Sequence, residues 1–151
     1  MCGIVGYVGS LEAKPILIDG LKRLEYRGYD SSGVSFFQNG VLSVVKAKGK
    51  ISELEKKLEG YSTFGTLAIG HTRWATHGKP SDENAHPHAT EKVSLVHNGI
   101  IENYLELKKE LLDLNVSLKT DTDTEIITGL MHFNLASGYE PLAALRKTID
   151  R

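Results

Sequence analysis

The feature that most constrains the fold is a pair of β-rich runs, residues 33–38 and 41–46, separated only by Asn39 and Gly40. Both residue types tolerate the positive φ angles that a two-residue type I′ turn requires at its central positions. The pattern therefore predicts an antiparallel hairpin. Any fold for this chain must place these two strands side by side.

The other elements are predicted from the spacing of apolar residues and from turn signals. Strands are expected over 2–8, 66–72 and 92–97, with a loop over 79–90. Helices are expected over 12–26, 51–58 and 141–149, after Asn103, and from Thr122 through 126–131. Together with the hairpin, this order indicates an α+β domain built largely on antiparallel strands.

Two of the expected helices begin with a capping signal. Ser52 with Glu55, and Thr122 with Glu125, have the three-residue spacing of a capping box. In such a box the hydroxyl and the carboxylate satisfy N–H groups of the first turn. We therefore expect one box at the start of each of these helices.

The length and charge of the chain limit its class. Its 151 residues suit one compact domain, and 18 Lys and Arg against 19 Asp and Glu give a formal net charge of -1. Because no block of like charge occurs, we expect neither nucleic acid nor a membrane surface as a partner. A small polar ligand fits this composition better.

The single cysteine, Cys2, cannot form an internal disulfide, which favours a reducing compartment. The apolar start of the chain lacks a basic region and reaches charged residues at Glu12 and Lys14. It therefore matches neither a signal peptide nor a membrane span. We expect a cytoplasmic protein.

Cys2 is also a candidate nucleophile, because removal of Met1 would give one residue both a thiol and a free α-amine. An α-amine has an ordinary pKa of roughly 7.7 to 8.0, so near neutrality a useful fraction is neutral and can accept the thiol proton. The alternative is that Cys2 is a small buried hydrophobic residue. Its position alone leaves both interpretations open.

Three other positions could bind or activate a small substrate. Arg73 follows an expected strand, where its guanidinium could bind a carboxylate, although a surface ion pair is the alternative. Asn98 and Gly99 could form an oxyanion hole or a plain turn. Asp121 and Asp123 flank a helix start, so they could cap the helix or bind an ammonium group.

Five of the six histidines lie between His71 and His97, which raises a zinc site as an alternative. No HExxH or Cys/His ligand set accompanies them, so we predict no metal. Residues 65–72 nearly spell a phosphate loop. His71 stands where that loop requires Lys, so we reject this interpretation.

Six segments together resemble a known family. They are MCGIVG at 1–6, LEYRGYDS at 24–31, GHTRWATHG at 70–78, NAHPH at 84–88, VHNGIIEN at 96–103 and TDTE at 122–125. In this order they resemble the glutaminase domain of the glutamine:fructose-6-phosphate aminotransferase (glucosamine-6-phosphate synthase) family. The opening Cys-Gly-Ile and the Asn-Gly pair are shared with other N-terminal-cysteine amidotransferases. The segments 25–30 and 71–78 are similar to the hexosamine enzymes in particular.

The resemblance implies an N-terminal-nucleophile hydrolase fold, a four-layer αββα sandwich with two antiparallel sheets between helical layers. The family's glutaminase domain continues beyond residue 151 and is followed by sugar isomerase domains. We therefore expect residues 1–151 to be a C-terminally truncated amidotransferase type 2 domain. Missing strands would leave a sheet edge unpaired, which favours self-association, so a homo-oligomer is one expectation.

The resemblance also implies a reaction, the hydrolysis of L-glutamine to glutamate and ammonia without a cofactor. This is the ammonia-supplying half of glucosamine-6-phosphate synthesis from fructose 6-phosphate. The implied catalytic residues are Cys2, as the nucleophile, and Asn98 with Gly99, at the oxyanion. The implied substrate ligands are Arg73 for the α-carboxylate, Asp123 for the α-amino group, and Trp74, Thr76 and His77 in a loop over glutamine. Arg27, His86 and His97 are expected to support the site.

The sequence leaves two alternatives open. A truncated chain could be a non-catalytic module that binds glutamine or a partner. In addition, if Met1 stays in place, the Cys2 nitrogen is tied up in a peptide bond and the base is lost.

Overall fold

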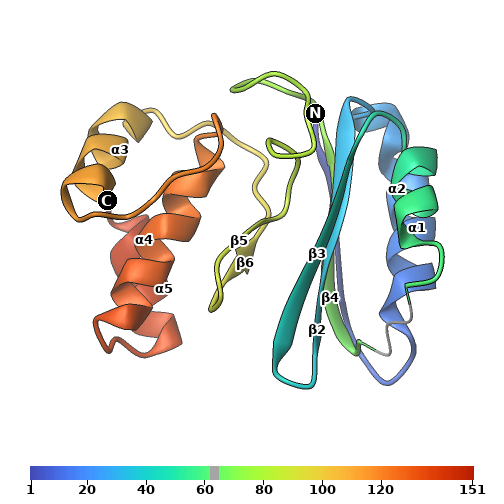
Figure 1. The fold of residues 1–151 in the computed structure, drawn as a ribbon, viewed down its shortest axis with the longest axis horizontal. Helices are drawn as coiled ribbons and strands as arrows, with labels where there is room; N and C mark the ends of the chain where they lie inside the picture. Colours follow the sequence, from blue (N-terminus) through green and yellow to red (C-terminus); the bar gives the residue numbers. More distant parts are fainter. Residues whose placement is uncertain (62–64) are drawn as a thin grey trace.

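The computed structural model describes residues 1–61 and 65–151. Its elements, in chain order, are β1 (Gly3–Val8), α1 (Ala13–Leu24), the 3-10 helix η1 (Glu25–Arg27), β2 (Ser31–Gln38), β3 (Val41–Lys48), α2 (Ile51–Leu58), β4 (Leu67–Arg73), β5 (His88–Ala89), β6 (Ser94–Leu95), α3 (Tyr104–Asp113), α4 (Thr124–Ala136) and α5 (Pro141–Ile149). Figure 1 shows four layers: α1 and α2, the sheet of β1 to β4, the β5–β6 pair, and α3 to α5. The predicted α+β class and the αββα order of layers are confirmed.

The first sheet has the strand order β1-β4-β2-β3, and every neighbouring pair is antiparallel. The predicted hairpin is confirmed, because Gln38 pairs with Val41 and the two residues between them, Asn39 and Gly40, have φ angles of 51° and 81°. β4 lies between β1 and β2, so the end of β4 is next to the start of β1. Because the pair is antiparallel, with Gly3 opposite Thr72, the start of the chain and the segment after β4 lie side by side at one end of the sheet.

One face of this sheet packs against α1 and α2. Apolar residues at helical spacing in α1, namely Ala13, Leu17 and Leu21, are fully buried there. They pack with residues from both helices and three strands to form the main hydrophobic core, whose other buried members are Val34, Phe36, Ala47, Ile51, Leu54, Leu58 and Ala68. This core holds the sheet rigid under the segments that follow its strands.

Successive side chains of a strand point to opposite faces of the sheet. Ala68 of β4 belongs to the core beneath the helices, so His71 and Arg73 point to the other face. On that face the His71 ring contacts the backbone of His97, in the segment that follows β6. The central strand thus carries polar side chains into the space between the second and third layers.

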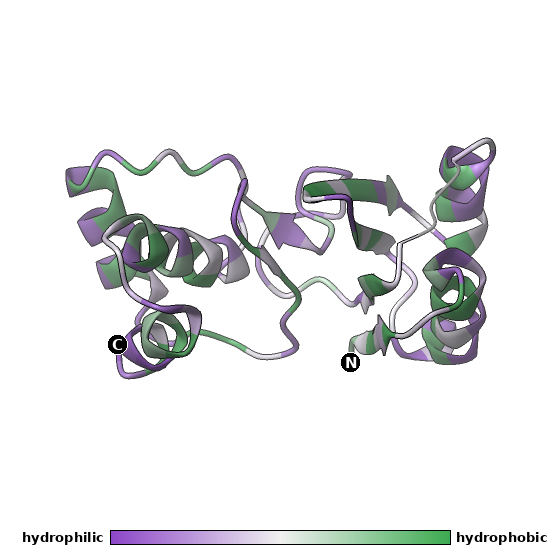
Figure 2. Cartoon of the chain, turned by 90° about the horizontal axis from the view of Figure 1, so that it is seen from below, coloured by the Kyte–Doolittle hydropathy of each residue, from purple (hydrophilic) through white to green (hydrophobic). Residues whose placement is uncertain are grey.

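The fourth layer has a separate, smaller core between α3 and α4. Its buried members are Leu107, Leu111, Ile126 and Leu130. Among the described residues, no helix has the length and apolar character that crossing a membrane requires. In Figure 2 the helices carry hydrophilic and hydrophobic residues side by side, which fits helices packed on one face only.

The predicted capping box at the start of α2 is wrong. The helix begins after Lys50, so Ser52 lies within its first turn and makes no capping hydrogen bond. Instead, Ile51 N–H donates to Glu25 Oε1 over 2.8 Å. A carboxylate distant in sequence therefore replaces the local cap.

The predicted box at the start of α4 is also wrong. The helix begins after Asp123, one residue later than a cap at Thr122 requires, and no side chain caps it. The Glu125 carboxylate accepts instead from the backbone N–H groups of Lys119 and Thr120, at 2.8 and 2.7 Å. Glu125 thus orders the turn before the helix, which leaves Asp123 available for other contacts.

The third layer is shorter than predicted. Only Ser94 and Leu95 of the expected strand 92–97 pair as β6, and their partner β5 lies within the expected loop 79–90. Beyond Leu95 the chain leaves the sheet, because the His97 carbonyl accepts from the His71 ring and not from a neighbouring strand. This departure places residues 97–99 over the end of β4.

Candidate functional site

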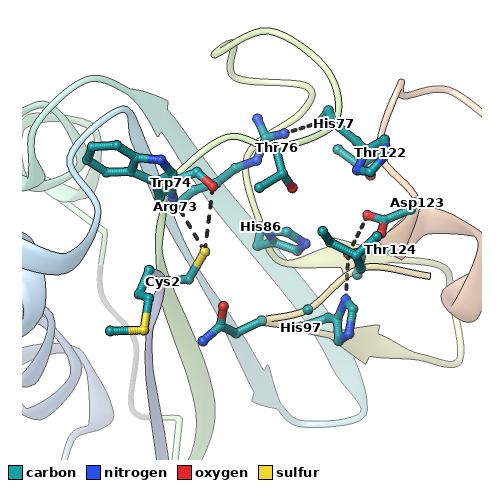
Figure 3. Close-up of a pocket in the computed structure, with 14 residues that line it drawn as sticks. Cys2, Arg73, Trp74, Thr76, His77, His86, His97, Thr122, Asp123 and Thr124 are labelled. Carbon is teal, nitrogen blue, oxygen red and sulfur yellow. Dashed lines mark hydrogen bonds between the residues drawn. The ribbon is translucent and has the colours of Figure 1, made fainter. Parts of the chain in front are cut away.

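A cavity of about 280 Å³ lies where the sheets meet the start of α4. Four segments build it: the residues before β1, the loop after β4, the loop after β6 and the turn before α4. Figure 3 shows the 14 lining residues, which are Met1, Cys2, Arg73, Trp74, Thr76, His77, His86, His97, Asn98, Gly99, Ile100, Thr122, Asp123 and Thr124. Of the predicted site residues, all but Arg27 and Asp121 are among them; Asp121 is exposed, and its Oδ2 accepts from Asn84 Nδ2 over 3.4 Å.

Cys2 is held just before the start of β1 by contacts that involve β4 and Trp74, the residue after it. Gly3 N–H donates to Thr72 Oγ1 over 3.0 Å, which fixes the residue next to the cysteine. Trp74 N–H donates to Cys2 Sγ over 3.4 Å, and the thiol lies 3.8 Å from the Trp74 carbonyl oxygen. The sulfur points into the cavity (Figure 3). The interpretation of Cys2 as an ordinary core residue does not fit this half-buried position.

Arg73 ends β4 and is only 3% exposed. Its Nη2 donates to the backbone carbonyls of His77 and, over 3.1 Å, Gly78. Its Nη1 is buried and has no hydrogen-bond partner among the described residues. Burial lowers the pKa of Arg73, while the negative charges of Asp30 and Asp123 act in the opposite direction. A buried guanidinium with a free N–H group is suited to bind a carboxylate.

Asp123 lies across the cavity from Cys2 (Figure 3) and is only 4% exposed. Its Oδ2 accepts from Ile101 N–H over 2.9 Å, and its Oδ1 accepts from Thr124 Oγ1 over 3.4 Å. The side chain makes no capping bond to α4, so the capping interpretation is wrong for Asp123. Its carboxylate can instead bind a cation in the cavity.

Asn98 and Gly99 are held over the cavity by two contacts of the preceding residue, His97, one through its backbone carbonyl and one through its ring. The His71 ring donates to the His97 carbonyl over 3.2 Å, and the His97 ring is 3.2 Å from Thr124 Oγ1. At Gly99 a Cβ atom would lie 2.6 Å from His97 Nε2, so only glycine fits without displacing that ring. The loop is thus fixed to the first sheet and to the start of α4.

The loop after β4 closes one side of the cavity. Trp74 is 48% exposed and meets Tyr29 edge to face at 5.5 Å between ring centroids. The His77 ring meets Tyr104, the first residue of α3, at 5.2 Å. Trp74, Thr76 and His77 line the cavity, which is where a loop over the substrate would have to lie.

Three buried histidine rings, those of His71, His86 and His88, contact one another beside the cavity, which His86 lines. The centroid distances are 4.2 Å between His71 and His86 and 4.7 Å between His86 and His88. Burial lowers the pKa of His71 to about 4 and that of His88 to about 3, and it lowers the pKa of His86 further. All three rings are therefore neutral near pH 7. In the part of the chain that the structure describes, no group of three His, Cys, Asp or Glu residues is arranged to hold a metal ion.

Some residues stand outside the expected set. Arg27 lies in η1, away from the cavity, and its Nε donates to Tyr26 Oη over 3.1 Å. Thr122 and Thr124 line the cavity although no role there was predicted for them. Both are neighbours of Asp123 in sequence, and this was the one signal that could have predicted their place in the cavity. His71 could have been found from strand alternation, since it shares a face with Arg73.

The chain is similar to known amidotransferases in sequence. The family model described as glutamine amidotransferase domain matches residues 43–145. The whole chain is 50% identical to glutamine–fructose-6-phosphate aminotransferase [isomerizing] of Caldanaerobacter subterraneus subsp. tengcongensis, of which it covers 25%, and 56% identical to the protein of that name from Aquifex aeolicus, of which it covers 26%. The chain therefore spans about a quarter of the length of these relatives.

Two solved structures are similar over 99% of the chain. One is the glutamine phosphoribosylpyrophosphate amidotransferase from B. subtilis complexed with ADP and GMP, with a TM-score of 0.83, 28% identity and 32% of that chain covered. The other is an allosteric regulatory enzyme of purine biosynthesis, with a TM-score of 0.85, 28% identity and 33% of that chain covered. The arrangement of layers is thus shared with proteins of lower sequence identity.

Proposed function

This chain belongs to the glutamine amidotransferase domain family, and on that premise we propose that it hydrolyses L-glutamine to glutamate and ammonia with Cys2 as the nucleophile. The observation that carries the proposal is the shared cavity. One thiol, one buried guanidinium with a free N–H group, one buried carboxylate and an Asn-Gly loop line the same space of about 280 Å³. Glutamine offers a complementary group to each of them.

Arg73 and Asp123 bind the amino acid end of the substrate. The unpartnered Nη1 of Arg73 donates to the α-carboxylate, and the Asp123 carboxylate accepts from the α-ammonium group. Because both protein groups are buried, these charged contacts are weakly screened. They orient the side-chain amide of glutamine toward Cys2.

The first chemical step forms a γ-glutamyl thioester. With Met1 removed, the neutral α-amine of Cys2 takes the thiol proton, and the sulfur attacks the amide carbon of glutamine. The oxyanion accepts hydrogen bonds from the Asn98 side-chain amide and the Gly99 N–H. The protonated α-amine of Cys2 then gives this proton to the leaving nitrogen of the glutamine amide, so the C–N bond breaks and ammonia departs.

The second step releases glutamate. The Cys2 amine, again neutral, takes a proton from water, and the resulting hydroxide attacks the thioester carbon. The tetrahedral intermediate uses the same donors from residues 98 and 99. Breakage of the C–S bond releases glutamate and the Cys2 thiolate, which takes the proton back from the α-ammonium group of Cys2, so that the thiol and the neutral amine are restored.

The proposal extends to the longer relatives. The chain spans about a quarter of proteins named glutamine–fructose-6-phosphate aminotransferase [isomerizing]. We infer that residues 1–151 form part of an amidotransferase type 2 domain, whose ammonia serves a sugar isomerase domain acting on fructose 6-phosphate outside these residues. A cytoplasmic location, supported by the single cysteine, and a homo-oligomer belong to the same proposal.

A glutaminase assay tests the proposal. Protein freed of Met1 is mixed with L-glutamine, and glutamate release is followed for the parent and for Cys2→Ala. We expect release that depends on Cys2. A folded, Met1-free parent that releases no more glutamate than the Cys2→Ala variant would contradict the proposal.

A further inference from the structure

Asn84 has no role in the proposed chemistry, yet its side chain hydrogen-bonds to Lys79 and to Asp121, which lie close in sequence to groups of the site. It belongs to the loop between β4 and β5 and is only 3% exposed. It does not line the cavity itself. A buried amide that makes no substrate contact must serve the segments that it touches.

Both ends of the Asn84 amide are used in joining two segments. Its Nδ2 donates to the Lys79 carbonyl over 3.0 Å and to Asp121 Oδ2 over 3.4 Å. Its Oδ1 accepts from Asp121 N–H over 3.0 Å. One side chain therefore ties the end of the loop after β4 to the turn before α4.

Each of these segments leads directly to a charged group of the site. Lys79 follows Gly78, whose carbonyl accepts from Arg73 Nη2 over 3.1 Å. Asp121 precedes Asp123 by two residues. The amide of Asn84 is thus the link between the support of the guanidinium and the support of the carboxylate.

Close packing at Gly78 strengthens the link. This residue has a φ of +76°, and a Cβ atom there would lie 2.8 Å from Asn84 Nδ2 and 3.0 Å from Asp121 Cβ. The glycine lets the loop lie directly against both partners. Hydrogen bonding and packing therefore fix the same two segments together.

Resting on the proposed glutaminase function, we propose that Asn84 is a positioning residue that sets the separation of Arg73 and Asp123, and thereby the affinity for the α-amino acid end of glutamine. The thiol is held separately, through Gly3 and Trp74. Asn84 therefore governs binding of the zwitterionic end more than the reactivity of Cys2.

The isosteric variant Asn84→Asp tests this role. A carboxylate keeps the acceptor for Asp121 N–H but cannot donate to the Lys79 carbonyl, and it places negative charge against the Asp121 carboxylate. Loss of a buried donor of this kind predicts a rise in KM for glutamine of about tenfold or more, with kcat changed less than about threefold. Alkylation of Cys2 by iodoacetamide, which lacks an amino acid end, keeps the parent rate.

Two further variants separate positioning from general loosening. Asn84→Ser is a smaller polar replacement that serves if Asn84→Asp does not fold, and we expect the same rise in KM. Ser81→Ala is the matched control, because Ser81 Oγ accepts from Asn84 N–H over 3.1 Å but takes no part in the side-chain hydrogen bonds from Asn84 to Lys79 and Asp121. Its KM should stay within about twofold of the parent.

The outcomes distinguish this inference from the proposed function. If the parent hydrolyses glutamine and the folded Asn84 variants keep its KM, the positioning role is overturned while the function stands. If KM rises but kcat and the alkylation rate both fall as well, Asn84 supports the whole site and the positioning role is likewise wrong. A parent that hydrolyses no glutamine overturns the function and, with it, this inference.

Discussion

The backbone N–H of Trp74 donates to the sulfur of Cys2 over 3.4 Å. Seventy-two positions separate the two residues, and the β1–β4 register, with Gly3 opposite Thr72, brings them together. The residue before Trp74 is the buried Arg73. The same strand pairing therefore sets the nucleophile beside the expected carboxylate ligand.

Arg73→Lys should weaken glutamine binding. Lysine carries its three N–H donors on one nitrogen atom and lacks the planar fork of arginine, which uses Nη2 for the two backbone carbonyls and leaves Nη1 for the substrate. We expect KM for glutamine to rise by about ten- to a hundredfold, with little loss of Cys2 alkylation by iodoacetamide. Arg23→Lys, on the exposed face of α1, is the control. Equal KM values for the parent and Arg73→Lys would refute the assigned contact.

Asn98→Ala should impair the chemical step. Removal of one oxyanion donor typically lowers kcat by about 10²- to 10³-fold. Because Asn98 is exposed, thermal stability should change little. Stopped-flow or steady-state kinetics would measure kcat, and a melting curve would check the fold. An unchanged kcat in this variant would remove Asn98 from the oxyanion hole.

Retention of Met1 should abolish turnover. In the unprocessed chain the Cys2 nitrogen is an amide and cannot accept a proton. After removal of Met1, kcat/KM should rise with pH through roughly 7.7 to 8.0, because the base must be neutral to take the thiol proton. Comparison of the unprocessed protein with its aminopeptidase-treated form tests both points. Full activity with Met1 in place would exclude the α-amine as the base.

The buried histidines should make the fold sensitive to acid. Burial lowers the pKa of His71 to about 4 and of His88 to about 3, from the ordinary 6.5. At a pH between the lowered pKa and the ordinary pKa of each ring, the unfolded chain binds a proton that the folded chain does not. The free energy of unfolding is therefore highest above a pH of about 6.5 and falls as the pH decreases toward about 4.

Denaturant unfolding at a series of pH values would measure this dependence. The variant His88→Gln removes one of the titrating rings, so its free energy of unfolding should change less steeply with pH over the same range. His132→Gln is the control, because that ring lies outside the cluster of His71, His86 and His88. A parent whose stability does not change with pH in this range would contradict the neutral, buried state of the rings.

Most elements of the fold could be predicted because their signals are local. The Asn39-Gly40 turn and the spacing of Leu17 and Leu21 are set by neighbours in sequence, and the structure confirms the hairpin and α1. The caps of α2 and α4 could not be predicted. Glu25 bonds to Ile51 across 26 positions, and such a tertiary contact has no local signal.

The candidate site was predicted mainly through the resemblance of its segments to a family. Residue types alone left Cys2, Arg73 and Asp123 each with an ordinary structural alternative. In the structure these three residues line one cavity. That they come together could not be predicted from the type of each residue alone. Arg27 does not reach that cavity, and the link through Asn84 depends on packing between segments, so neither could be judged before the fold was known.

The most direct test of the account is covalent labelling of Cys2 by 6-diazo-5-oxonorleucine, a glutamine mimic that alkylates nucleophiles in glutamine sites. Intact mass and peptide mapping before and after exposure report both the loss of Met1 and the site of any adduct. We expect one adduct, on Cys2 of the Met1-free protein, and we expect excess glutamine to prevent it. A folded, Met1-free protein that gains no adduct, or gains one elsewhere, would contradict it.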